Sequence, residues 1–233
     1  MKKPVFENEN FVLYSPDSLK GLNDRLEDIL NETLDTYKEL FDIEDFRKVQ
    51  INYFDNLDEF REFIYGLRGE SKSLPEYARG TFDKGMINAY VDPAKAKTIK
   101  KLYMASHELF HIMYQELVWE KSNEDRIIWF DEGMAQFFSG ENKNTDYDVL
   151  LERVKENTKV YPELNKISHG NSFKNDDYNG YNISLLSVHY LHEKLGHEGF
   201  KELMHDTDRI KKYGETVLEE VIKNNKKEFI KKQ

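Results

Sequence analysis

The segment 102–118, LYMASHELFHIMYQELV, constrains the fold more than any other, because it is apolar on nearly every side when wound as a helix. Its apolar residues include Leu102, Met104, Ala105, Leu109, Phe110, Ile112 and Met113. A helix that is apolar all round is buried. This one also carries His107, Glu108 and His111, whose burial without partners would cost roughly several kcal/mol. These three side chains must therefore bond each other and the backbone, or share a cation.

The spacing of the two histidines suits a metal ion. Residues four apart on a helix lie one above the other, so His107 and His111 can both direct an imidazole at one ion. Glu108 is turned by about 100° and can reach a water on that ion. The alternative is a pair of core histidines that are satisfied by hydrogen bonds within the protein.

Composition limits the other donors and the partners. The chain has 233 residues, enough for one domain with a substantial core, and no cysteine, which excludes disulfides and thiolate metal sites. A metal must then be held by His, Asp, Glu or Tyr. The net charge of −10 argues against a nucleic-acid groove, which needs a basic face.

Strand-like segments come first and helical ones after. Before residue 94 the patterns predict strands at 11–15 and 48–54, helices at 18–41 and 56–66, and a hairpin at 80–92 that turns at 83–85. Beyond it they predict helices at about 94–118, 124–139, 145–158, 179–195, 197–205 and 215–229. This order predicts an α+β fold in one domain, with a small mixed sheet in 1–93, an all-helical part in 94–233 and a cleft between the two.

The next helical segment, 127–140, offers a third ligand. Its sequence IIWFDEGMAQFFSG contains Asp131 and Glu132, followed by the small residues Gly133 and Ala135. Small residues let a helix pack closely on its neighbour, as a short carboxylate requires if it is to reach an ion held by the HELFH helix. Either carboxylate can serve by this argument.

HELFH and the later motif W-x-x-E-G-x-A at 129–135, in which twenty residues separate His111 from Glu132, resemble the gluzincins, the thermolysin- and aminopeptidase-type zinc metallopeptidases. The resemblance implies a zincin-like fold, Zn²⁺ held by His107, His111 and Glu132, and an Asp131 that points away. It also implies peptide hydrolysis, with Glu108 as the general base and a peptide or protein as substrate. The metzincin branch is excluded, because Leu117 stands where its third histidine would be.

Two further stretches match the family more weakly. GMINAYVD at 85–92 is similar to its edge strand, which implies that Asn88, Ala89 and Tyr90 hold an extended substrate. The segment 178–196 is similar to a helix that opens with a tyrosine, which implies that Tyr181 helps to stabilise the oxyanion. One departure is that Gln136 replaces an aspartate that orients a zinc histidine, so that partner must lie elsewhere.

Other interpretations stay open. One alternative is a gluzincin-like module that binds peptide or metal without turnover, and another is a structural α+β interaction protein without metal. His189, His192 and His197 are predicted to be exposed or partly packed helix residues, since no carboxylate motif converges on them. The lack of an aminopeptidase G-x-M-E-N motif favours an endopeptidase or a peptidase of narrow specificity.

No apolar run at the amino terminus fits a signal peptide, and no segment fits a membrane span. We therefore expect a cytoplasmic protein if the termini are native, and a secreted one if a leader was removed.

Overall fold

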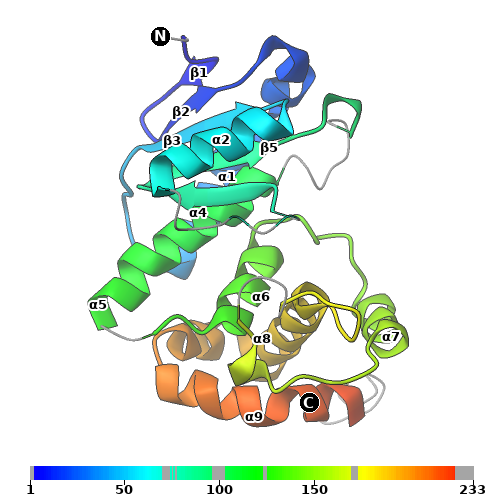
Figure 1. The fold of residues 1–233 in the computed structure, drawn as a ribbon. Helices are drawn as coiled ribbons and strands as arrows, with labels where there is room; N and C mark the ends of the chain where they lie inside the picture. The colour runs from blue at the N-terminus through cyan, green and yellow to red at the C-terminus, as the bar shows by residue number, and fades with distance from the viewer. Residues whose placement is uncertain are drawn as a thin grey trace. The chain divides into compact units, whose positions relative to one another are not determined.

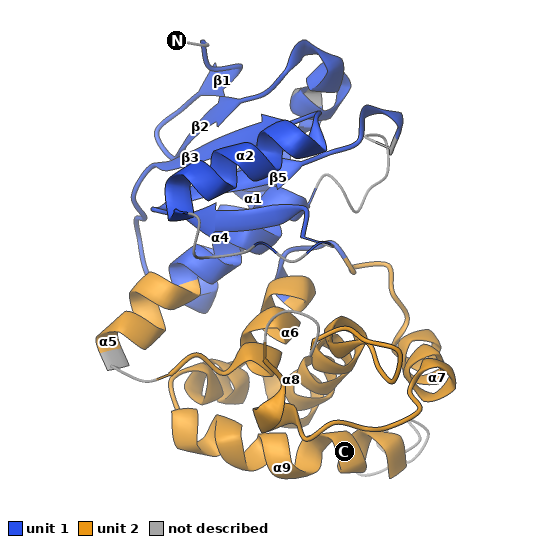
Figure 2. Ribbon diagram, viewed as in Figure 1, with its two compact units in different colours: residues 1–113, 138–141 blue, residues 114–137, 142–233 orange. Residues whose placement is uncertain are grey.

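The structure is a computed structural model that describes residues 3–69, 74, 76, 78–95, 103–122, 125–168 and 173–223 (Figure 1). The chain forms two compact units (Figure 2). The first unit comprises residues 1–113 and 138–141, and the second comprises residues 114–137 and 142–233. The first unit continues past residue 93 and includes the helix that carries HELFH. The coarse prediction, an α+β chain with an N-terminal sheet and a helical second half, is confirmed.

The described part of the first unit contains a five-stranded mixed sheet in the order β1-β2-β3-β5-β4. The strands are β1 (Phe6–Glu7), β2 (Phe11–Tyr14), β3 (Val49–Phe54), β4 (Gly80–Asp83) and β5 (Met86–Tyr90). β2, β3 and β5 run parallel, and β1 and β4 add antiparallel edges. Only the two-residue β1 was not predicted, because it is too short for alternation to show.

The predicted hairpin is confirmed, with a two-residue turn at Lys84 and Gly85 whose φ angles of 50° and 74° suit a type I′ turn. Its placement in the sheet corrects one expectation. β5, which contains Asn88, Ala89 and Tyr90, pairs with β3 on one side and β4 on the other. The prediction that this segment is a free edge strand is therefore wrong, because its backbone hydrogen bonds are taken up on both sides. In this half of the described sheet the edge strand is β4, and β1 forms the opposite edge.

The helices of the first unit lie close to their predicted positions. They are α1 (Lys20–Leu40) after the 3-10 turn η1 (Asp17–Leu19), α2 (Leu57–Arg68), the 3-10 turn η2 (Pro93–Lys95) and α4 (Met104–Tyr114). The side chain of Asn56 accepts hydrogen bonds from the first turn of α2, a cap worth about 1 kcal/mol. α2 does not end at Gly66 as predicted but at Arg68, and Gly69, whose φ is 78°, caps it.

Helices cover both faces of the sheet (Figure 1). On one face, the ring of Phe54 in β3 packs against Phe60 and Phe63 of α2, with centroids 5.7 and 5.3 Å apart. On the other face, the neighbouring Tyr53 hydroxyl meets the backbone of Ala105 in α4, and burial raises the pKa of Tyr53. The alternation of side chains along β3 thus places α4 against the sheet.

α4 is buried as its apolar sequence predicted: Ala105, Leu109, Phe110, Ile112 and Met113 are almost inaccessible to solvent. Its Ser106 is satisfied by α1, because the Ser106 hydroxyl lies 3.1 Å from Thr33 Oγ1 and its carbonyl accepts a hydrogen bond from Tyr37 at 3.0 Å. The start of the long helix predicted at 94–118 lies partly outside the described residues. From Gln115 to Trp119 the predicted α-helix is instead a π-helix, η3.

The second unit is helical. It contains η3, α5 (Glu120–Ser122), most of α6 (Ile128–Phe138), α7 (Tyr147–Asn157), the 3-10 turn η4 (Leu164–Lys166), α8 (Gly180–Met204) and α9 (Thr207–Lys223). The break predicted at Gly196 is a kink inside α8, where φ is 68°. α9 starts eight residues before the predicted 215, and the predicted end at 229 lies outside the described residues. Within the described residues, no helix combines the length and apolar character that a membrane crossing requires.

Gly133 sets the spacing between α6 and α8. A Cβ at this position would lie 2.5 Å from the carbonyl oxygen of Ser184 and 2.6 Å from a methyl carbon of Val188. From the sequence we expected the small residues of α6 to face the HELFH helix, but the close approach at Gly133 is to α8. Space at this position is therefore needed for the packing of the second unit.

We expect Gly133→Ala to destabilise the protein by about 1–3 kcal/mol, because the added methyl group would force the backbone of α8 away from α6. Gly66→Ala in α2 is the matched control, since its Cβ would meet nothing within 4 Å. That control should be neutral or stabilising by about 0.5–1 kcal/mol. Urea denaturation measures both, and equal stabilities for the two variants would contradict the close contact.

Candidate metal centre

His107 and His111 converge on one point beside α4. Their Nε2 atoms are 3.1 Å apart, and their ring centroids are 4.8 Å apart with the planes at 80°. The ring of His111 also stacks on Phe82 of β4 at 5.9 Å, and His111 is only 3% exposed. Helical spacing alone brings the two rings together, as predicted. The contact with β4 then holds the second ring in place.

A carboxylate from outside α4 approaches the other nitrogen of His107. Oε1 of Glu141 lies 3.4 Å from His107 Nδ1, and the Glu141 side chain is only 9% exposed. The Gly140 turn before it has a φ of 85°, and a Cβ there would lie 2.9 Å from the ring of Tyr103. A carboxylate at Nδ1 favours a proton on that atom, which leaves Nε2 as the lone-pair donor that a metal needs. Glu141 was not predicted from the sequence. The only sequence signal that points to it is its position just after the helix that carries Asp131 and Glu132.

Glu108 points toward the start of the edge strand β4. A Cβ on Gly80 would lie 2.6 Å from Glu108 Oε1, so a larger residue at that position would displace the Glu108 carboxylate. Burial is the largest cause of the raised pKa of Tyr53, and the negative charge of the half-buried Glu108 raises that pKa further. Glu108 therefore lies beside the one strand of the described sheet, apart from β1, that has an unpaired side.

The two candidate carboxylates of α6 are both buried and both contact Arg126. Asp131 is fully buried and forms an ion pair with Arg126 Nε. Oε1 of Glu132, whose side chain is 8% exposed, lies 3.3 Å from Arg126 Nη2. Sequence reasoning did not single out Arg126, because nothing in the local pattern distinguishes it from a surface arginine.

Gln136, which stands in place of the expected aspartate, joins two helices of the second unit. Its Nε2 donates to the carbonyls of Glu132 at 3.1 Å and Tyr181 at 3.0 Å. Tyr181 is the second residue of α8, and its ring packs edge-on against Phe173 at 4.6 Å. Gln136 thus connects the first turn of α8 to α6. The carboxylate that approaches His107 is that of Glu141.

The predicted substrate residues lie elsewhere than expected. Asn88 and Ala89 are completely buried, and Asn88 accepts a hydrogen bond from the Asn52 side chain at 2.8 Å. Tyr90 packs against the cluster of Phe60, Ile64 and Leu74 under α2. Their predicted role rested on a free edge, and that edge belongs to β4.

The remaining histidine cluster is packed among aromatic rings. His189 and His192 contact Phe137 at 5.2 and 4.9 Å, and His192 lies 6.1 Å from His197. Burial lowers the pKa of His192, and the neighbouring His197 and His189 lower it further. These contacts are those of partly packed helix residues, as predicted.

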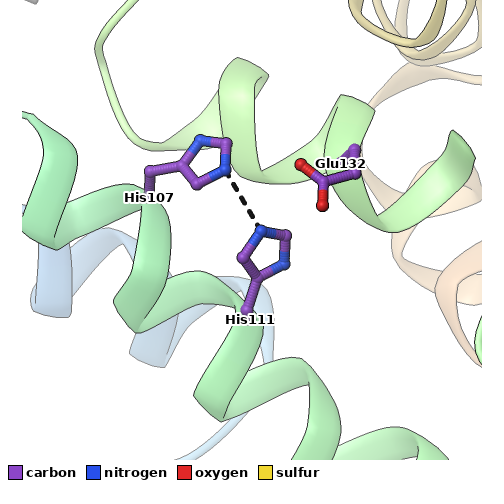
Figure 3. A group of neighbouring side chains, drawn as sticks. All are labelled: His107, His111 and Glu132. Carbon is purple, nitrogen blue, oxygen red and sulfur yellow. Dashed lines mark hydrogen bonds between the residues drawn. The ribbon is translucent and has the colours of Figure 1, made fainter. Parts of the chain in front are cut away.

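His107, His111 and Glu132 are the group of described residues that could hold a metal ion, and Asp131 is not part of it (Figure 3). Two neutral imidazoles and a carboxylate suit Zn²⁺, which takes nitrogen and oxygen donors. Comparison with protein families, curated proteins and solved structures gave no match.

We expect Glu141→Gln to lower zinc affinity about 10- to 100-fold, because the amide no longer favours the Nδ1–H tautomer of His107. Titration of the metal-free protein with zinc against a chelating dye measures this. Glu156→Gln, at an exposed position of α7, is the matched control and should bind zinc as the wild type does. Equal affinities in the two variants would remove Glu141 from the site.

Proposed function

We propose that this chain is a zinc-dependent peptide hydrolase of the gluzincin type with a zincin-like fold. One observation carries the proposal: on a single buried helix, two imidazole Nε2 atoms converge to 3.1 Å while the carboxylate between them in sequence faces an edge strand. A purely structural pair of histidines does not require that carboxylate. The resemblance of HELFH and W-x-x-E-G-x-A to the gluzincin motifs supports the same conclusion.

His107, His111 and Glu132 would hold the metal. The choice of Glu132 rests on the group of described residues that could hold a metal ion, to which it belongs. Asp131 is engaged by Arg126 and belongs to no ligand group of the described residues. When bound, Zn²⁺ supplies the Lewis acidity that makes water a nucleophile near neutral pH.

The protein side chains divide the remaining work. Glu108 accepts the proton of the attacking water and later gives it to the leaving amine. The unpaired side of β4 binds the peptide by main-chain hydrogen bonds. Because the Glu108 carboxylate lies beside Gly80 at the start of β4, this brings the scissile carbonyl next to Glu108. Tyr181 donates a hydrogen bond to the oxyanion, and Gln136 holds the backbone of Tyr181.

Removal of the third ligand tests the metal site. We expect near-stoichiometric zinc in wild-type protein purified without a histidine tag, and a sharp fall in Glu132→Ala, because two histidines alone leave the ion with too few donors. Elemental mass spectrometry measures both. Wild-type protein that holds no zinc after reconstitution would mean that HELFH is a buried polar group in a structural core.

Removal of the base tests the chemistry. Glu108→Gln keeps the size and shape of the side chain but cannot accept a proton, so zinc should stay bound while peptide hydrolysis falls by about 10²- to 10⁴-fold. Cleavage of a peptide library followed by mass spectrometry measures this. Retained hydrolysis in the variant would contradict the role of Glu108. Zinc binding without cleavage by the wild type would indicate a metal-binding module instead.

A further inference from the structure

Arg126 is held by three groups of the second unit at once. Its Nε pairs with Asp131, and its Nη2 lies 3.3 Å from Glu132 Oε1. Its Cζ lies 5.0 Å from the centroid of the Trp119 ring, in the π-helix η3. A guanidinium with two carboxylates on its edge and an aromatic ring on its face has little freedom to rotate.

The burial of two neighbouring carboxylates explains why a cation is needed there. Asp131 and Glu132 are adjacent in sequence, and their side chains are 0% and 8% exposed. Two buried negative charges side by side are strongly unfavourable unless a cation compensates them. Arg126, Asp131 and Glu132 together carry one net negative charge, the same as a single carboxylate. The pair of Arg126 and Asp131 therefore adds no net charge that would oppose a bound cation.

We propose that Arg126 is a positioning residue for the metal ligand Glu132. By holding Oε1, Arg126 fixes the orientation of the Glu132 carboxylate before the ion arrives, and Asp131 and Trp119 fix Arg126 in turn. This inference rests on the proposed function, since it assigns Glu132 to the metal. It also gives Asp131 a role: Asp131 neutralises and holds the arginine.

The geometry distinguishes arginine from lysine at this position. A guanidinium presents several N–H groups in one plane and can contact two carboxylates and a ring face together. An ammonium is a point charge on a flexible stem and cannot hold the same orientation. A lysine would therefore compensate the charge without fixing the carboxylate.

The test is the zinc affinity of metal-free protein, titrated against a chelating dye, for wild type, Arg126→Gln and Arg126→Lys. We expect Arg126→Gln to bind zinc about 10-fold or more weakly, as for other residues that orient a metal ligand. Arg126→Lys should recover folding stability but not affinity. The visible absorption of Co²⁺ in place of zinc is a second readout and should change in both variants, because it reports coordination geometry. Arg153→Gln, at an exposed position of α7, is the matched control.

Each outcome decides the inference. Unchanged affinity and cobalt absorption in Arg126→Gln would overturn it while leaving the metal site intact. Tighter zinc binding in that variant would also overturn it, because Arg126 would then compete with the metal for Glu132. If the wild type binds no zinc, the proposed function fails and this inference fails with it. Should Arg126→Gln not fold, the double variant Arg126→Gln/Asp131→Asn removes the uncompensated charge and gives the same comparison.

Discussion

The burial of polar residues on an apolar helix is the constraint on which the rest of this structure depends. α4 packs against both α1 and the sheet. In such a buried position an unpaired imidazole or carboxylate would cost roughly several kcal/mol. Each polar residue of its central turns accordingly meets a specific partner. Ser106 meets Thr33 and Tyr37 of α1, His107 meets His111 and Glu141, and Glu108 occupies the space that the absent side chain of Gly80 leaves.

The same physics governs α6 in the second unit. Asp131 and Glu132 are buried there together, and Arg126 compensates both while its guanidinium lies over Trp119. A buried carboxylate held by an arginine keeps one orientation, which is the property that a metal ligand needs. The two helices thus prepare different parts of one proposed centre, nitrogen donors on α4 and an oriented oxygen donor on α6.

The predictions that failed share one cause. Alternation in GMINAYVD correctly indicated a strand, but the pattern cannot tell which member of a hairpin lies at the edge of a sheet. That depends on β3, more than thirty residues earlier in the chain, which pairs with β5 rather than with β4. In the same way, the small residue Gly133 correctly indicated close helix packing, but the partner is α8, more than fifty residues later.

The sequence by itself determined what local geometry controls. The order of strands and helices, the burial of α4, and the convergence of His107 and His111 follow from helical and strand periods within short windows. Only the tertiary structure decided the partners of these residues. Glu141 Oε1 lies 3.4 Å from His107 Nδ1, Arg126 is shared by Asp131 and Glu132, and β4 instead of β5 is an edge strand of the described sheet. These contacts join segments that no local period relates, because side-chain partners across a core are chosen by the packing of whole elements.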